Sequence, residues 1–262
     1  MTAFVGSVPE LYDRINGPVM FEPYARDLAR RVPGDARRLL EVGAGTGRVT
    51  RHLVARLPAD GELTATDLNR AMLEYARSAI DDARITWRIA DAQALPLPDA
   101  DVDVAAFQFG LMFVPDKPRA VRELWRVLRP GGVALVNTWD TLVANRAIGI
   151  VHEVACAACP ADPPRFYETP YGMTDRDALA ALFRAAGFAR VEVETVAAVG
   201  EAPSAREAAH GLLRGTPIVD QLVERRLDLE ALERAAEARL AAELGDHPCR
   251  QPLLAHVVTA MR

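Results

Sequence analysis

The segment at residues 39–48 combines an apolar run, an acidic residue and three glycines at two-residue spacing, and an amphipathic stretch follows it. This order predicts a buried strand, a tight turn and the first turn of a helix. Glycine permits positive φ and lets a ligand approach the main chain closely. The helix that follows offers free N–H groups and the positive end of its dipole. The segment therefore indicates a nucleotide-like cofactor at a strand–turn–helix junction of an α/β protein.

The spacing of the glycines separates two kinds of nucleotide cofactor. The dinucleotide fingerprint G-x-G-x-x-G places its third glycine five positions after the first. Counted from Gly43, that position holds Arg48, whereas the chain continues with Gly45 and Gly47. The pattern thus disfavours NAD, although an ordinary strand–helix turn of an α/β protein also satisfies it.

Composition indicates a globular protein and argues against two classes of partner. Of 262 residues, 50% are hydrophobic and 26% are charged, and the net charge is −5. This acidic balance disfavours a nucleic-acid surface. The N-terminus does not resemble a signal peptide, and the longest apolar stretch, residues 102–114, is too short to span a bilayer. The three cysteines fit a reducing cytoplasm. We therefore expect a cytoplasmic protein without a nucleic-acid or membrane partner.

Strand and helix patterns alternate from residue 38 to residue 139. The predicted strands are residues 38–42, 62–66, 84–90, 102–107 and 133–139. The predicted helices are residues 48–57, 70–80 and 117–128, the last of which we expect to stop at Pro130-Gly131-Gly132. This alternation predicts a doubly wound sheet that binds ligands at the carboxyl ends of its strands.

The pattern becomes less regular after residue 139. We predict helices at residues 142–158, 177–186 and 205–244, the last broken near residues 215–217, and strands at 188–197 and 253–260. We expect one domain over residues 1–262. Within it we expect an N-terminal helical arm (1–37), a cofactor-binding core (38–143) and helical cap insertions (144–186 and 200–250).

Polar residues follow three of the predicted strands. Asp67 ends the second strand, where a carboxylate can accept hydrogen bonds from both ribose hydroxyls, and it or Asn69 can instead cap the next helix. Asp91 ends the third strand, where it can accept from an adenine amino group or serve as a turn residue. Gln108 follows the fourth strand and needs hydrogen-bond partners if it is buried.

Four segments together resemble the class I S-adenosylmethionine-dependent methyltransferases. They are residues 41–47, 67–68, 91–92 and 127–132, and they occur in the order and places typical of that family. The chain is similar in particular to ubiquinone/menaquinone-type C-methyltransferases and many small-molecule methyltransferases. The resemblance covers residues 38–139. It implies a Rossmann-like, seven-stranded, mostly parallel sheet with S-adenosyl-L-methionine as cofactor.

The resemblance also implies roles for individual residues. Glu41 and the glycine turn would hold the methionine part of the cofactor, Asp67 the ribose, and Leu68 the adenine face. The remaining cofactor-binding residues implied are Tyr12, which would close over the cofactor, Gly43, Ala44, Gly45 and Gly47 of the turn, Asp91 and Ala92 at the adenine edge, and Gln108 and Phe109 near the methyl donor. Residues 21–25 would form a helix that covers the site.

The methyl acceptor is expected to be a small, partly hydrophobic molecule that attacks the activated methyl group in line. The acceptor pocket is predicted from Trp139, Asn145, Tyr167 and Tyr171. No catalytic residue is assigned; His152 and His210 are the candidates for a general base if the acceptor arrives protonated. Cys156-Ala-Ala-Cys159 lacks a second cysteine pair, so we expect no metal site.

Two alternatives stay open. One is a catalytically silent S-adenosylmethionine-binding protein, and the other is an NAD-dependent oxidoreductase. The sequence does not reveal the acceptor, the atom that is methylated or the oligomeric state.

Overall fold

The computed structural model describes residues 11–262. The chain divides into two compact units. The sheet unit comprises Tyr24–Trp139, Met173–Val196 and Ala255–Arg262, and the helical unit comprises Met1–Pro23, Asp140–Gly172 and Ala197–Leu254. The first ten residues of the predicted arm lie outside the described residues. The expected single domain and its boundaries stay a prediction.

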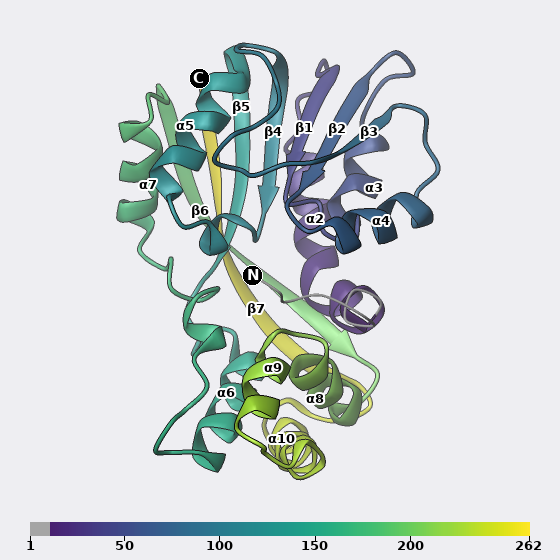
Figure 1. Ribbon diagram of the computed structural model, residues 1–262, viewed down its shortest axis with the longest axis vertical. Coiled ribbons are helices and arrows are strands. Elements are labelled where there is room, and N and C mark those ends of the chain that lie inside the picture. Colours follow the sequence, from purple (N-terminus) through teal and green to yellow (C-terminus); the bar gives the residue numbers. More distant parts are fainter. Residues whose placement is uncertain (1–10) are drawn as a thin grey trace. The chain divides into compact units, whose positions relative to one another are not determined.

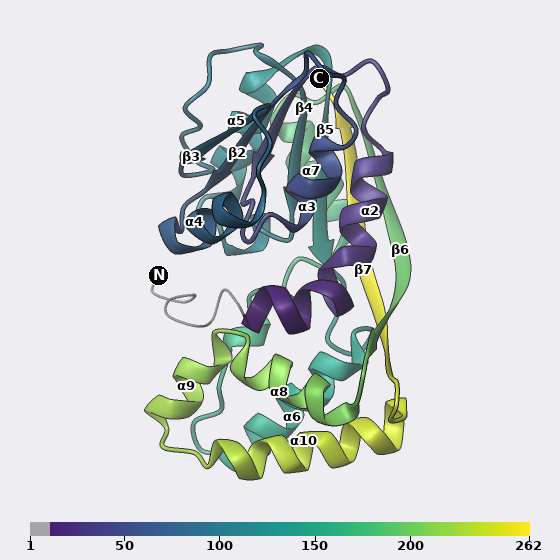
Figure 2. The same cartoon turned by 90° about the vertical axis from the view of Figure 1, so that its right-hand side faces the viewer.

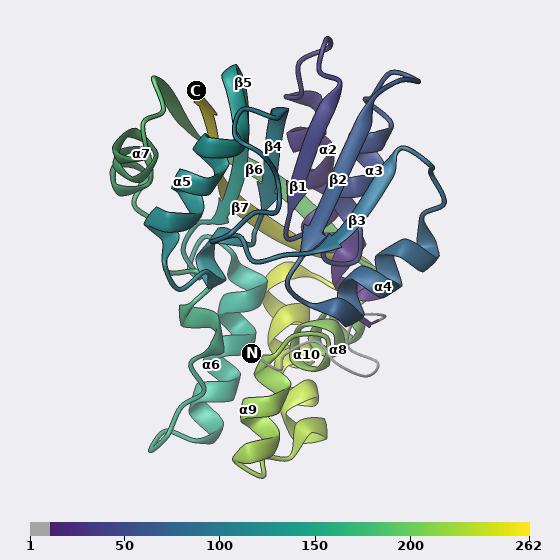
Figure 3. The same cartoon turned by 45° about the horizontal axis from the view of Figure 1, so that its top comes forward.

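The sheet has seven strands in the order β3-β2-β1-β4-β5-β7-β6 (Figures 1 and 3). Four neighbouring pairs, from β3 to β5 along the sheet, are parallel, and β7 runs antiparallel to β5. The predicted doubly wound, mostly parallel sheet is therefore confirmed. The strands are β1 (Arg38–Val42), β2 (Glu62–Asp67), β3 (Ile85–Ile89), β4 (Val102–Gln108), β5 (Leu128–Trp139), β6 (Arg190–Ala202) and β7 (Cys249–Met261).

Three helices of the sheet unit begin at polar caps. The side chains of Asn69 and Asp175 each accept hydrogen bonds from two backbone N–H groups at the start of α4 and α7, and Asp116 accepts one from the N–H of Arg119 in α5. These helices are α2 (Glu22–Arg30), α3 (Arg48–Val54), α4 (Arg70–Ala79), the 3₁₀ turn η2 (Leu111–Phe113), α5 (Lys117–Val127) and α7 (Arg176–Ala185). Of the predicted covering helix at residues 21–25, Phe21 ends the π-helix η1 (Tyr12–Phe21) and the other residues begin α2. That this segment covers the site stays a prediction.

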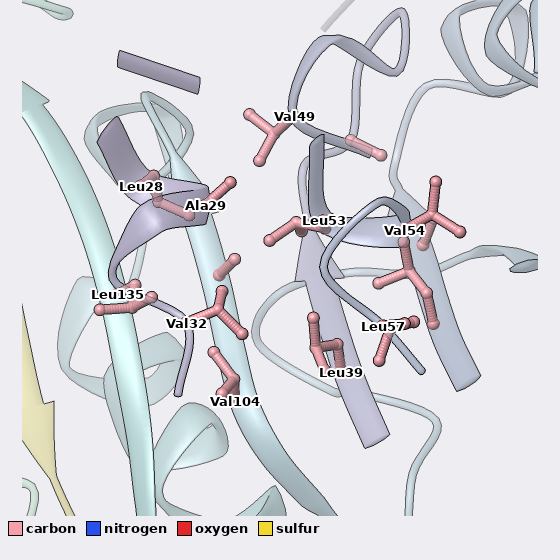
Figure 4. Close-up of a cluster of buried hydrophobic side chains, with 14 of the residues drawn as sticks. Leu28, Ala29, Val32, Leu39, Val49, Leu53, Val54, Leu57, Val104 and Leu135 are labelled. Atoms are coloured by element: carbon pink, nitrogen blue, oxygen red, sulfur yellow. The ribbon is translucent and has the colours of Figure 1, made fainter. Parts of the chain in front are cut away.

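Alternation along the strands builds a separate core on each face of the sheet. On one face, Leu39 and Leu135 pack with Leu28 of α2 and Leu53 of α3 (Figure 4). On the other face, neighbouring strand residues such as Val136 pack with helices α5 and α7. A residue two positions beyond Leu39 or Leu135 therefore faces the α2–α3 side at the carboxyl edge of the sheet.

The helical unit contains η1 (Tyr12–Phe21, a π-helix), α6 (Arg146–Ala158), the 3₁₀ turn η3 (Phe166–Glu168), α8 (Ala205–Arg214), α9 (Ile218–Glu224) and α10 (Leu229–Leu244). Helix α8 contacts η1, α6 and α10 (Figure 2). The break that we predicted near residues 215–217 separates α8 from α9, and a second break at residues 225–228, which we did not predict, separates α9 from α10. None of the helices within residues 11–262 combines the length and the apolar character that crossing a bilayer requires.

Three predicted strands had the wrong bounds. Strand β6, predicted at residues 188–197, runs from Arg190 to Ala202. The Pro130-Gly131-Gly132 segment, which we expected to precede the fifth strand, lies inside β5. The N–H of Gly131, which has a φ of 80°, donates to the carbonyl of Arg262 at 3.0 Å, and the N–H of Arg262 donates to the carbonyl of Gly132 at 2.9 Å. The last strand begins at Cys249, because β7 continues beyond its apolar pattern alongside β6.

Candidate functional site

The glycine turn after β1 is tied to the end of β2. Gly43, Gly45 and Gly47 all have positive φ, at 68°, 56° and 81°. The N–H of Gly45 donates to Asp67 Oδ2 at 2.8 Å. A Cβ at Gly47 would lie 2.5 Å from Cδ1 of Ile80, so that position also requires the missing side chain. The glycine turn and Asp67 are therefore held together at the carboxyl edge of the sheet.

Asp67 is bonded to the glycine turn and does not cap the next helix. Its Oδ1 accepts a hydrogen bond from the N–H of Asn69 at 2.7 Å, while the side chain of Asn69 is the N-cap of α4. Burial raises the pKa of Asp67, and the N–H groups that point at it oppose that effect by favouring the charged form. A carboxylate held by backbone donors in this way keeps a fixed position with lone pairs left for a ligand.

Glu41 is buried at the end of β1, with 2% of its surface exposed. Its Oε2 accepts a hydrogen bond from Thr50 Oγ1 at 2.6 Å. Burial raises the pKa of Glu41 to about 8, and the negative charge of Asp67 adds to that shift. The site thus contains an acid that can be neutral or ionised near neutral pH.

Leu68 and Asp91 lie at the ends of the next two strands. Leu68 follows Asp67 directly and exposes 53% of its surface, which makes it an apolar platform beside an acid. Asp91 accepts from the backbone N–H of Gln93 at 2.8 Å and from its side-chain amide at 3.0 and 3.1 Å. Asp91 therefore organises a turn, and Gln93 is a partner that the sequence analysis missed.

Four polar side chains gather on the same face at this edge. Leu63, Leu39, Val104 and Leu135 belong to the core cluster that faces α2 and α3. Alternation puts Asp67, Glu41, Gln108 and Asn137 on that face too, at the ends of β2, β1, β4 and β5. Gln108 pairs in register with Asn137. Asn137 was not predicted, although it carries the signal that drew attention to Gln108, a polar residue that ends an apolar strand.

An aromatic group lies at the end of β4 and β5. The rings of Phe109 and Trp139 stack with their centroids 3.8 Å apart and their planes at 3°. Tyr24 of α2 meets both rings edge-on, with centroids 5.4 Å apart in each case. The hydroxyl of Tyr24 donates to the carbonyl of Val196 at 3.1 Å. The predicted residues Phe109 and Trp139 are thus brought together in one stack.

Four predicted binding residues belong to the helical unit and have partners within it. Tyr12 stacks on Phe21 with centroids 4.8 Å apart. The side-chain amide of Asn145 exchanges two hydrogen bonds with the backbone of Leu254, both at 3.0 Å. The hydroxyl of Tyr167 donates to the carbonyl of Leu212 at 2.8 Å, and Tyr171 packs near the Tyr167 ring. Their binding roles stay predictions.

The candidate bases also lie in the helical unit. The ring of His152 is 3.7 Å from the sulfur of Cys156, and burial raises the pKa of that thiol. Nδ1 of His210 is 3.6 Å from Oε1 of Glu233. Neither contact assigns a catalytic role. Within residues 11–262, no group of three or more metal-ligating side chains is placed to hold an ion.

Comparison with known proteins places this site in a family. A family model described as a methyltransferase domain matches residues 40–136. The ubiquinone/menaquinone biosynthesis C-methyltransferase UbiE of Acidiphilium cryptum (strain JF-5) is 34% identical over 173 residues, which cover 61% of this chain and 69% of the relative. The chain belongs to the class I S-adenosylmethionine-dependent methyltransferases. The cofactor of this family is S-adenosylmethionine.

Other relatives show how far the likeness of this methyltransferase extends. UbiE of Idiomarina loihiensis is 39% identical over 103 residues, which cover 38% of this chain and 41% of the relative. The chain spans about half the length of the first curated relatives it matches. The crystal structure of the [4+2]-cyclase SpnF has a TM-score of 0.59 at 21% identity and covers 97% of this chain and 92% of SpnF. At that identity the likeness concerns the fold alone.

The residues at the edge of the sheet fit S-adenosylmethionine. A Cβ at Gly45 would meet no atom within 4 Å, so the main chain of the turn is open to a ligand. Asp67 offers an acceptor for ribose hydroxyls, and Leu68 offers an exposed apolar surface for a base. Glu41 offers a carboxyl group that becomes more acidic if a cation approaches it. These groups match the parts of the cofactor in chemistry and in order across the strands.

Proposed function

We propose that this methyltransferase transfers the methyl group of S-adenosylmethionine to a small-molecule acceptor. The observation that carries the proposal is the gathering of Glu41, Asp67 and Gln108 beside the glycine turn on one sheet face. The names of the UbiE relatives, which are biosynthetic C-methyltransferases, support a small molecule as acceptor. The net charge of −5 agrees, because it disfavours a nucleic-acid substrate.

We propose that three strand ends hold the cofactor. Glu41 and the main chain of Gly43–Gly47 hold the methionine part, and Asp67 accepts hydrogen bonds from the ribose. Leu68 packs on the adenine, and the N–H of Ala92 and the carboxylate of Asp91 read the adenine edge. Because Asp67 already receives the N–H of Gly45, ribose binding and the conformation of the turn are coupled.

When bound, S-adenosylmethionine supplies an electrophilic methyl group on a sulfonium. The work left to this chain is to orient the acceptor for in-line attack and to keep water away. Gln108 and Phe109 lie at the end of β4, next to the strand that carries Glu41, and we assign them to the methyl-donor end. A proton on the acceptor would pass to a base, for which His152 and His210 remain the candidates.

A second candidate function is cofactor binding without methyl transfer. The specific observation in its favour is the fold shared with SpnF, which is named a [4+2]-cyclase and not a methyltransferase. The presence of three cysteines supports a cytoplasmic location for either function.

Calorimetric titration of the protein with S-adenosylhomocysteine and with NAD tests the proposal. We expect S-adenosylhomocysteine to bind and NAD not to bind, and binding of NAD alone would reject the proposed function. A second step incubates the protein with isotope-labelled S-adenosylmethionine and a metabolite panel. Transfer of the label to a panel member supports a methyltransferase, whereas binding without any transfer favours the silent alternative.

A further inference from the structure

Asn137 in β5 is a buried amide whose side chain has no hydrogen-bond partner within residues 11–262. None of its surface is exposed, and neither Oδ1 nor Nδ2 forms a hydrogen bond. Buried polar groups in native proteins nearly always have partners, because losing water without a replacement is unfavourable. A group that departs from this rule indicates a partner that arrives from outside the chain.

The register of the sheet places this amide at the edge that carries the proposed cofactor site. Leu135, two residues earlier, faces the cluster that contains Leu28 and Leu53 (Figure 4). Asn137 therefore points to the same face one step closer to the carboxyl edge. It pairs with Gln108 of β4, and β4 pairs with β1, which carries Glu41.

The strand order also decides on which side of the cofactor Asn137 lies. The proposed cofactor residues Asp67 and Glu41 are on β2 and β1, and β4 and β5 follow in that direction. Neighbouring strands are about 4.8 Å apart, so Asn137 is about 10 Å from the line of β1. Since the adenosine part points toward β2 and β3, the acceptor approaches the methyl group from the side of β4 and β5.

The main chain of Asn137 supports a strained aromatic residue. Phe109 has a φ of 52°, a conformation that bulky residues rarely adopt. Its N–H donates to the carbonyl of Asn137 at 3.0 Å, and its ring stacks on Trp139. Strain of this kind is typical of functional sites. The amide therefore lies beside a flat aromatic surface that the same strands hold in place.

We infer that Asn137 binds the methyl acceptor through a neutral group that both donates and accepts a hydrogen bond, such as a hydroxyl or a primary amide. Nδ2 donates to that group and Oδ1 accepts from it. The stacked rings of Phe109 and Trp139 favour an acceptor whose neighbouring part is planar and apolar. This inference rests on the proposed function, because it takes the position of the cofactor from it.

The test uses ligand-observed NMR on the full chain saturated with S-adenosylhomocysteine. The probes are benzyl alcohol and benzamide, with toluene as the probe that lacks a hydrogen-bonding group. The variant is Asn137→Ala, and the control is Val136→Ala, which truncates a buried neighbour on the opposite face of the same strand. Thermal unfolding of each variant without ligand is the second readout.

The wild type is expected to bind at least one polar probe in clear preference to toluene. Asn137→Ala is expected to lose that preference by about tenfold, to retain its affinity for S-adenosylhomocysteine within twofold, and to unfold at the same temperature or a higher one. Val136→Ala is expected to unfold at a lower temperature with its probe preference unchanged.

Three results would overturn the inference. They are a wild type that shows no preference for a polar probe, an Asn137→Ala variant that keeps the preference, and an Asn137→Ala variant that unfolds below Val136→Ala. If the wild type fails to bind S-adenosylhomocysteine at all, the proposed function itself fails. That result is distinct from the other three, because each of them presupposes a bound product.

Discussion

The carboxyl edge of the sheet and the helical unit of this methyltransferase use their buried polar side chains differently. In the sheet unit, Glu41 and Asn137 point from the ends of strands to one edge. In the helical unit, the amides of Asn16 and Asn145 and the hydroxyl of Tyr167 bond to main-chain groups of the same unit. The amide of Asn137 has no partner within residues 11–262 and Glu41 accepts from its near neighbour Thr50, whereas the side chains of the helical unit join distant segments.

This difference separates two roles of a polar residue in an apolar environment, which are ligand binding and stabilisation of the fold. At strand ends the main chain already has its sheet partners, so the side chain is available for a ligand. In the helical unit, the amides of Asn16 and Asn145 add a second hydrogen bond to the carbonyls of Gly211 and Leu254, which already accept main-chain N–H groups, and so they link segments distant in sequence. Substitutions in the helical unit are thus expected to change stability, and those at the sheet edge to change binding.

The largest effect is expected from Asn145→Ala. The amide of Asn145 donates to carbonyls of Thr141 and Leu254 and accepts from the N–H of Leu254. Its loss removes these three hydrogen bonds and takes the acceptor from the N–H of Leu254, although the two carbonyls keep a main-chain donor each. We expect the free energy of unfolding to fall by about 3 kcal/mol. Urea unfolding measures the change, and calorimetry is expected to show unchanged affinity for S-adenosylhomocysteine. A large loss of affinity with little loss of stability would show that Asn145 serves binding, like the residues at the sheet edge, and not stability.

Asp67→Ala is expected to weaken S-adenosylhomocysteine binding by about 2 kcal/mol, because the ribose hydroxyls and the N–H of Gly45 lose an acceptor. The matched control is Asp103→Ala. Asp103 is a buried acid near the amino end of β4, and it accepts from the N–H groups of Arg37 and Arg38 at 2.6 and 3.0 Å. The control is expected to lose stability and keep its affinity. Equal affinity in both variants would reject the ribose assignment.

The sequence predicted the sheet unit well because each of its elements has a local signal. The positive φ values of Gly43–Gly47 and the acid at the end of β2 follow from residue type and position. Asn69, which was considered as the helix cap, has that role. Strand alternation then determined which side chains share a face.

The remaining features depend on contacts between residues distant in sequence. Gln93 holds Asp91 through a turn whose geometry no spacing rule gives. The hydrogen bond between Asn145 and Leu254 joins residues 109 apart in the chain. Local composition gives no sign of it, so Asn145 was predicted to line a ligand pocket. The strained φ of Phe109 likewise depends on its neighbour Asn137 in the next strand.

A pH dependence of about 1.4 kcal/mol per pH unit is expected from Glu41. The pKa of this acid is about 8 in the folded chain and 4.5 in its ordinary state. Between these values the folded state keeps a proton that the unfolded state has lost, so the free energy of unfolding falls as the pH rises.

Urea unfolding between pH 5.5 and 7.5 measures this dependence in the wild type and in Glu41→Gln, which cannot titrate. The glutamine variant is expected to show a shallower decline than the wild type. Parallel curves would show that Glu41 is ionised in the folded protein across this range. Hydrogen bonds such as that from Thr50 would then stabilise the charge of Glu41 within the folded chain, as hydrogen bonds stabilise the polar groups of the helical unit.

The smallest effect is expected from Tyr167→Phe, at about 1 kcal/mol of unfolding free energy. The carbonyl of Leu212 accepts from the hydroxyl of Tyr167 at 2.8 Å and also from that of Thr216 at 2.9 Å. One donor remains after either single substitution, so each loss is small. The double variant with Thr216→Val removes both, and its cost is expected to exceed the sum of the single costs by about 0.5 kcal/mol or more. If the two costs were additive and Tyr167→Phe also weakened methylation of the acceptor, Tyr167 would be assigned to acceptor binding and not to the stability of the helical unit.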